Sequence, residues 1–237
     1  MVEVYVSMLG EERVNDEKFI DYMNSMIQDI HEHISSNEPT VVSPEVYAWR
    51  VIDGDILLFI INKPSEKFSG RYSPGKNKKD KKLALNVANT PLEKSFAQQD
   101  WTDVIDNMRN VLFHELTHYI DFDRMETHDD YSTPKEKASL EFNAVFNSIV
   151  QHFYKKADSI ANSKETDKLA MFHSAFGDSP TRFLKNTMDI LLKNKVISDE
   201  FPTVDQWHWK KRLFDTYRIL RDRIFKTIIS KESVYRI

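Results

Sequence analysis

The sequence predicts an α+β protein of 237 residues, in which a small N-terminal β-sheet precedes a mainly helical C-terminal part. β-Branched and aromatic runs lie before Trp101, whereas apolar residues at three- and four-residue spacing continue from there to the end. Strands that precede helices, rather than alternating with them, are typical of the α+β class. We expect one domain over residues 1–160 and a helical subdomain over residues 161–237, packed on the first.

The composition excludes several kinds of site. The chain has no cysteine, so disulfides, thiol nucleophiles and thiolate metal sites are ruled out, and His, Asp and Glu remain as strong metal ligands. None of the five glycines has the spacing of a phosphate-binding loop. A net charge of −4 gives no global reason to expect nucleic-acid or membrane binding. No export signal or membrane span is apparent, so we expect a soluble protein.

The first elements follow from local patterns. A short strand is expected at Val2–Met8, and apolar spacing predicts an amphipathic helix over Asp16–Ile34. The runs Glu45–Ile52 and Asp55–Ile61 predict two strands, and the Asp-Gly dipeptide between them favours a tight hairpin turn.

The next stretch changes character. Lys63–Lys82 is rich in lysine, with serine, proline and glycine between, and predicts a mobile basic loop. Leu83–Ala88 is an apolar stretch of strand length. From Trp101 the pattern is helical, with breaks expected near residues 129–133, 158–167, 177–180 and 197–203.

A motif with metal-binding chemistry lies in the helix expected over Thr102–Phe122. His114 and His118 are one turn apart on one face, so their imidazoles can bind the same metal ion. Glu115 lies about 100° around the helix, from where its carboxylate can reach a water molecule on that metal. The opposite side of the helix is apolar and predicts packing on a core.

A catalytic zinc ion normally has three protein ligands and one open position. A third histidine ten residues after the first is excluded, because Arg124 stands there. Two glutamates on the next helix remain as candidates. Glu136 has a structural explanation as the capping-box partner of Thr133, whereas Glu141 has none. We therefore favour Glu141 as the third ligand over Glu136.

These residues resemble the gluzincin branch of the zincin metallopeptidases. The two histidines and Glu115, followed by Glu141 in a Glu-Phe-x-Ala-x-Phe run, carry the likeness. Asp121 and Tyr131 extend it to the lethal-factor-like peptidases and their small phage-encoded relatives. The resemblance covers about Leu83–Gln151.

The resemblance implies a zincin-like fold and a role for each residue. His114, His118 and Glu141 would bind Zn²⁺, and Glu115 would transfer a proton from the attacking water to the leaving amine. Tyr131 would donate a hydrogen bond to the developing oxyanion.

Other features of the sequence concern the surroundings of this site. Asp121 could orient a ligand imidazole or could be a surface aspartate. The resemblance implies that an edge strand holds the peptide, and Leu83–Ala88 is placed to supply it. The loop Lys63–Lys82 could favour acidic substrates or be merely solvated. The basic helix expected over 206–230 could pack on the domain or bind a partner protein.

The leading hypothesis is a zinc-dependent metallopeptidase, an endopeptidase that hydrolyses a protein or peptide substrate. The alternative is a zincin-fold structural or binding component of a phage particle or regulatory assembly, with little turnover. A nucleic-acid binder, using the two basic stretches, is the third reading. We expect a cytoplasmic or virion-associated location and no membrane partner.

Overall fold

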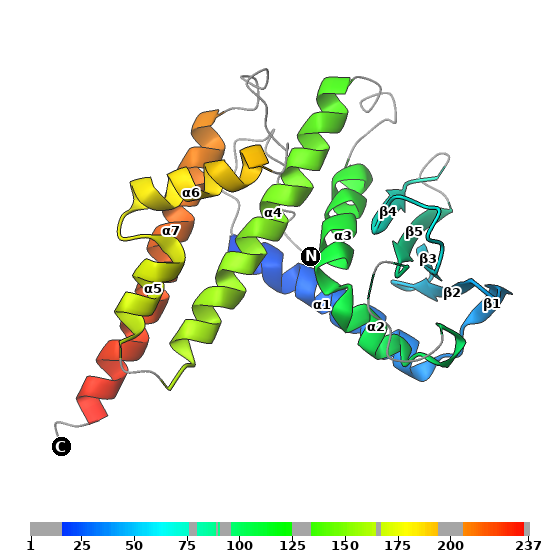
Figure 1. Cartoon of the computed structure of the whole chain (residues 1–237), viewed down its shortest axis with the longest axis horizontal. Coiled ribbons are helices and arrows are strands. Elements are labelled where there is room, and N and C mark those ends of the chain that lie inside the picture. The colour runs from blue at the N-terminus through cyan, green and yellow to red at the C-terminus, as the bar shows by residue number, and fades with distance from the viewer. Residues whose placement is uncertain are drawn as a thin grey trace. The chain divides into compact units, whose positions relative to one another are not determined.

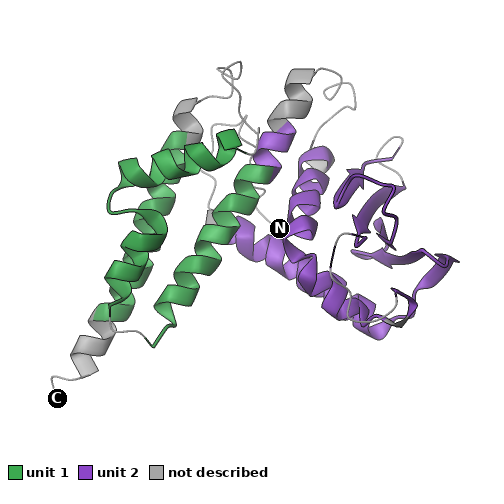
Figure 2. Cartoon of the chain, in the orientation of Figure 1, with its two compact units in different colours: residues 1–16, 145–237 green, residues 17–144 purple. Residues whose placement is uncertain are grey.

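The structure, a computed structural model, describes residues 16–75, 80–88, 90, 96–124, 134–164, 167–193 and 206–234. In these residues it has the α+β architecture expected from the sequence, with one mixed sheet and a helical remainder (Figure 1). The chain divides into two compact units (Figure 2). Unit 2 spans Glu17–Ala144, and unit 1 holds the described residues outside that range. The division falls within one long helix, earlier in the chain than the expected boundary after residue 160.

The sheet of unit 2 has five described strands: β1 (Thr40–Ser43), β2 (Val46–Val51), β3 (Ile56–Ile61), β4 (Gly70–Ser73) and β5 (Lys81–Asn86). Their order is β1-β2-β3-β5-β4. β3 and β5 are parallel, and the other neighbours pair in antiparallel fashion. The strands β2, β3 and β5 therefore form the interior of the sheet, and β4 is one edge of it.

The hairpin between β2 and β3 confirms the turn expected from the sequence. Ile52, Asp53 and Gly54 all have positive φ angles, of 54°, 51° and 83°. Asp and Gly tolerate this region of backbone space, whereas the β-branched Ile52 adopts it against its own preference. The registered pairing of β2 with β3 fixes the turn and so holds Ile52 in place.

The structure corrects two expectations about the strands. Leu83–Ala88 was expected to supply an edge strand, but β5 lies inside the sheet between β3 and β4. The edge strand β4 arises from Lys63–Lys82, which was expected to be a loop throughout. Its four residues become a strand because they pair with β5, an arrangement that no local pattern in Gly-Arg-Tyr-Ser indicates. β1 was also not expected, and Val2–Met8 lies outside the described residues.

Three described helices belong mainly to unit 2: α1 (Asp16–Ser36), α2 (Trp101–Asn107) and α3 (Arg109–Arg124). α1 confirms the predicted amphipathic helix, and its apolar stripe is buried: Phe19, Met23, Met26, Ile27, Ile30 and Ile34. The single helix expected over Thr102–Phe122 is two helices, divided at Met108. α1 contacts α3 through Phe19. Its ring meets the buried ring of Phe113 edge-on, with the ring centroids 6.3 Å apart.

Unit 1 contains most of α4 (Pro134–Ala161) together with α5 (Lys168–Phe176), α6 (Pro180–Lys193) and α7 (Gln206–Val234). The ends of α4, α5 and α6 agree with the breaks expected near residues 158–167 and 177–180, whereas the breaks expected near residues 129–133 and 197–203 lie outside the described residues. Their core is an aromatic cluster in mutual ring contact: Phe153, Phe172, Phe176, Phe183 and Tyr217. No helix in the described part of the chain is both long and apolar enough to cross a membrane.

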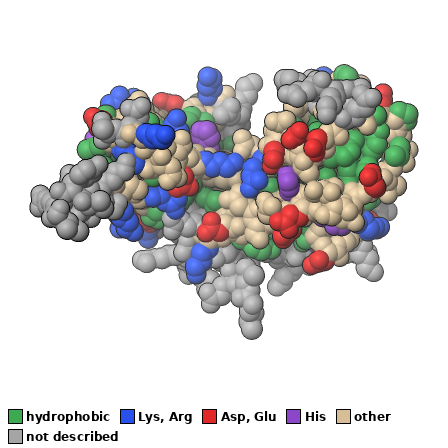
Figure 3. All heavy atoms as spheres, turned by 90° about the horizontal axis from the view of Figure 1, so that it is seen from below, with side chains coloured by type: hydrophobic (Ala, Val, Ile, Leu, Met, Phe, Trp, Pro, Cys, Tyr) green, Lys and Arg blue, Asp and Glu red, His purple; other side chains and the backbone are tan. Residues whose placement is uncertain are grey.

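The basic stretch of α7 is partly used inside unit 1. Arg212 donates to Oδ1 of Asn147 at 2.6 Å and lies over the ring of Phe146. Arg223 pairs with Asp158. Figure 3 shows Asp and Glu side chains as well as Lys and Arg side chains on the face of the molecule that is seen from below. Two of the arginines thus contribute to packing, while Arg218 is exposed.

A charged contact joins the hairpin to α3. Nζ of Lys81, a buried side chain, lies 2.7 Å from Oδ2 of Asp55, and the Tyr119 hydroxyl donates to the same oxygen at 2.9 Å. Burial raises the pKa of Asp55, but the hydrogen bonds from Lys81 and Tyr119 outweigh it, so the pKa lies below its usual value. The ionised carboxylate therefore stabilises the folded state.

Replacing Asp55 by asparagine should lower the free energy of unfolding by about 1–2 kcal/mol at pH 7, because the buried Lys81 ammonium loses its carboxylate. The effect is small because Asp55 is partly exposed and solvent screens its charge. A depressed pKa stabilises above the unfolded value of about 3.9, and this contribution is lost as the pH falls through the folded pKa. Urea unfolding should therefore show a difference at pH 7 that shrinks in acid, as the pH falls below about 3.9.

The matched control is Asp53→Asn in the same turn, where an exposed side chain should change stability little at either pH. If the effect of Asp55→Asn persisted unchanged in acid, it would not depend on the carboxylate charge. The ionised Asp55 would then not be the source of the stabilisation.

Candidate metal centre

Helix α3 presents the two histidines of the motif on one face, as expected. The imidazole rings of His114 and His118 have centroids 4.9 Å apart and stand nearly perpendicular, at 84°. Their side chains are 21% and 12% exposed. The opposite side of α3 is buried through Leu112 and Leu116 in the core of unit 2. The histidines are therefore held by a packed helix yet reach the surface.

Glu141 of α4 meets both histidines. Its Oε1 lies 3.4 Å from Nε2 of His114, and its Oε2 lies 3.3 Å from Nε2 of His118. One ligand atom from each of the three residues lies within 4.8 Å of the others. The structure thus brings together the three residues that the sequence indicated. Glu136, the alternative ligand, lies where side chains are not described.

The geometry of this group fits a small divalent cation. In a tetrahedral site with bonds of about 2.0–2.2 Å, neighbouring ligand atoms are about 3.3–3.6 Å apart. The His114–Oε1 and His118–Oε2 separations each lie in that range, one to each oxygen of the carboxylate. Two imidazoles and one carboxylate are a donor set that catalytic zinc sites use. The Glu141 side chain is 57% exposed, so the group is open to solvent on one side.

The electrostatics agree with metal binding. Hydrogen bonds from His114 and His118 lower the pKa of Glu141 far below its usual value, against the effect of burial. Burial lowers the pKa of His114, but the hydrogen bond and charge of Glu141 outweigh it and leave the pKa raised. Glu141 is therefore ionised at neutral pH, and protons compete with a metal ion for His114.

Glu115 is the buried acid of the site, with 6% of the residue exposed. Burial raises its pKa, and the charges of the neighbouring histidines and a hydrogen bond from the Tyr72 backbone N–H partly oppose that rise. The carboxyl group is thus held between α3 and β4 rather than free in solvent. A raised pKa suits a group that takes up and releases a proton.

Gly70 allows this close approach of β4 to α3. A Cβ atom at Gly70 would lie 2.5 Å from Cγ1 of Val111 and 2.6 Å from Oε1 of Glu115, both far inside van der Waals contact. Only glycine fits here without a shift of the strand or of the Val111 and Glu115 side chains. The sequence did not indicate this role, because Gly70 stands in a stretch that looks like a loop.

Asp121 has a different contact from the one expected. Its Oδ2 accepts a hydrogen bond of 2.6 Å from Nδ2 of Asn143, and both residues are buried. Nδ1 of His118 is buried and has no hydrogen-bond partner among the described residues, so Asp121 does not hold that imidazole. Tyr131, the expected oxyanion donor, lies outside the described residues and stays a prediction.

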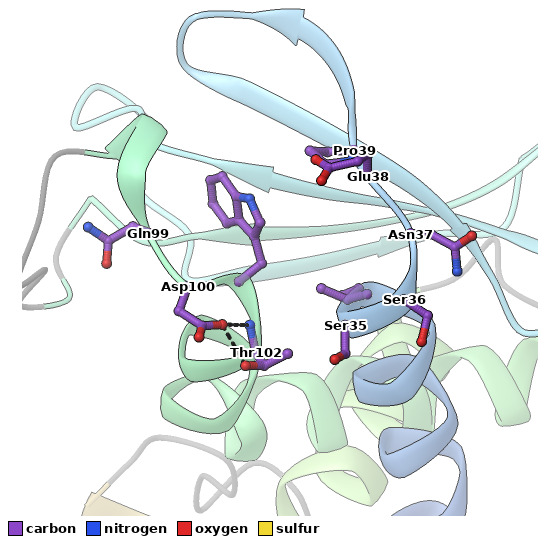
Figure 4. A pocket seen from close by; sticks show the side chains of 10 residues that line it. Ser35, Ser36, Asn37, Glu38, Pro39, Gln99, Asp100 and Thr102 are labelled. Atoms are coloured by element: carbon purple, nitrogen blue, oxygen red, sulfur yellow. Dashed lines mark hydrogen bonds between the residues drawn. The ribbon is translucent and has the colours of Figure 1, made fainter.

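A cavity of about 360 Å³ lies elsewhere in unit 2, where the end of α1 faces the start of α2 (Figure 4). Its lining includes Asn37, Asp100 and Trp101 but none of the residues of the metal group. Oδ1 of Asp100 caps α2 by accepting from Thr102, and Asn37 donates to the carbonyl of His33. These polar groups therefore already support the two helix ends.

Comparisons with known proteins do not identify a family for this chain. The chain matches no protein-family model, no curated protein sequence and no solved structure. The chemistry of the site thus rests on its own residues: two imidazoles, a carboxylate that meets both, and a buried acid beside them.

Proposed function

We propose that this protein is a zinc-dependent peptidase that hydrolyses peptide bonds of a protein or peptide substrate. The observation that carries the proposal is the approach of one carboxylate, from Glu141, to Nε2 of both His114 and His118. The two helices that supply these groups contact each other through buried side chains, so the arrangement belongs to the fold of unit 2. His114, His118 and Glu141 would hold the metal.

The residues around the metal group have distinct roles in this proposal. When bound, zinc would supply Lewis-acid activation of the scissile carbonyl and of a water molecule. Glu115 would take the proton from the attacking water and deliver it to the leaving amine. Burial supports this role, because a raised pKa lets Glu115 hold that proton during the reaction. Tyr131 remains the candidate donor to the oxyanion.

The position of the edge strand β4 favours an extended peptide as the substrate. Among the described strands it has a neighbour on one side only, and Gly70 lies directly against Glu115. An extended peptide that adds to this edge would form main-chain hydrogen bonds beside the metal group. Because such pairing is made by the backbone, the substrate needs an extended segment more than a particular sequence.

The test is the metal content and the activity of the same preparation. Elemental analysis of the full chain should give one zinc per chain, and His118→Ala should remove most of it. A mixture of unstructured peptides should be cleaved by the zinc-loaded protein, and a chelator should stop the cleavage until zinc is restored. A chain that takes up no zinc at neutral pH would overturn the proposal, and so would a zinc-loaded chain that cleaves nothing in a broad peptide mixture.

A binding component with little turnover is the second candidate, and α7 favours it. The exposed face of this helix carries Phe214 and Phe225, with Arg218 and Arg221 between them. Exposed aromatic rings beside arginines are common in protein interfaces. This candidate expects zinc uptake without cleavage and co-purification with a partner. Loss of the partner on Phe214→Ser, with zinc content unchanged, would support it over the peptidase.

A further inference from the structure

The contact between Asp121 and Asn143 links the two helices of the metal group. Asp121 is on α3, three residues after His118, and Asn143 is on α4, two residues after Glu141. The amide of Asn143 donates to the Asp121 carboxylate at 2.6 Å. The bond thus joins the helix that carries two of the ligands to the helix that carries the third.

Burial makes this contact strong. Asp121 and Asn143 are only 4% and 6% exposed. Burying a carboxylate is unfavourable unless it accepts hydrogen bonds, and a bond to a charged acceptor is stronger than one between neutral groups. Separation of α3 from α4 at this point would leave a buried carboxylate without its amide donor. The pair therefore resists such a displacement.

The position of Glu141 depends on the placement of its helix. Its side chain is more than half exposed and contacts the two histidines of α3. Glu141 and Asn143 are two residues apart on α4, and both side chains contact residues of α3. If α4 turned about its axis or slid along α3, the Glu141 carboxylate would leave the histidines. The Asn143 contact opposes both movements.

We infer that Asp121 and Asn143 are a positioning pair that sets the metal affinity by fixing Glu141 relative to His114 and His118. The inference rests on the proposed zinc site but not on peptide hydrolysis. Neither residue is among the three that could hold the metal. They act through the placement of the helix that carries the third ligand.

The test is the zinc dissociation constant of the full chain, measured by competition with a chromophoric chelator. Asn143→Asp sets two carboxylates against each other and should weaken zinc binding about 10- to 100-fold. The exchange Asp121→Asn with Asn143→Asp restores one donor and one carboxylate, so it should recover most of the affinity. Asn186→Asp, at an exposed position of α6, is the matched control and should leave the dissociation constant unchanged.

Thermal unfolding of each variant without added zinc separates positioning from general stability. If Asn143→Asp destabilises the fold but the folded protein binds zinc as tightly as the wild type, the inference is overturned. Failure of the exchange to recover affinity, with its fold intact, also overturns it. If the wild type binds no zinc, the proposed function falls and this inference falls with it. If zinc binds and the pair behaves as expected but no peptide is cleaved, only the peptidase function is lost.

Discussion

Replacing Glu115 by glutamine should lower kcat/KM for peptide cleavage by about 10²- to 10⁴-fold, the usual contribution of general acid–base catalysis. Glutamine has nearly the same shape but cannot take up a proton. Its amide oxygen can still accept the hydrogen bond from the Tyr72 backbone, so the contact with β4 is kept. Zinc content should stay at one per chain, because Glu115 is not among the three ligand residues.

The same variant should lose activity but not stability. Because burial raises the pKa of Glu115, its ionised form is disfavoured in the folded state, and a neutral amide removes that cost. The melting temperature of Glu115→Gln should therefore equal or exceed that of the wild type at neutral pH. Glu45→Gln, an exposed position in unit 2, serves as the control and should leave cleavage unchanged. Full activity of Glu115→Gln would remove Glu115 from the mechanism.

Replacing Gly70 by alanine should damage both the fold and the site. The new methyl group would meet Val111 at 2.5 Å and Glu115 at 2.6 Å, so either β4 moves out or the Glu115 side chain moves away. Overpacking of this kind costs about 1–3 kcal/mol, which urea unfolding can measure. Because Glu115 is one of the two groups displaced, kcat/KM should fall by more than the loss of folded protein explains.

A second substitution separates the two contacts of Gly70. In Gly70→Ala with Val111→Ala, the helix makes room for the methyl group at residue 111, but the contact with Glu115 remains. Stability should recover in part while activity stays low. Ser73→Ala, at an exposed position of the same strand, should leave both unchanged. If Gly70→Ala proved as stable and as active as the wild type, the close packing of β4 on α3 would be wrong.

Some of the fold could be read from local patterns. The stripe that includes Met23 and Ile27 predicted α1, and the Asp-Gly turn predicted the β2–β3 hairpin, because each signal lies within one element. The sheet order could not be read in this way. β4 has four residues, one of them a glycine, and becomes a strand only by pairing with β5. Its partner lies further along the chain, and no local signal reports it.

The candidate site shows the same division. The spacing of His114, Glu115 and His118 follows from the helical repeat, so the sequence alone determined that two imidazoles share a face and that an acid lies beside them. The sequence also favours Glu141 as the third ligand, yet the approach of its carboxylate to both histidines depends on how α4 packs on α3. Only the tertiary structure decided that packing, the edge position of β4 and the contact of Asp121 with Asn143. These three features join segments distant in sequence, and such contacts depend on burial and shape rather than on any local periodicity.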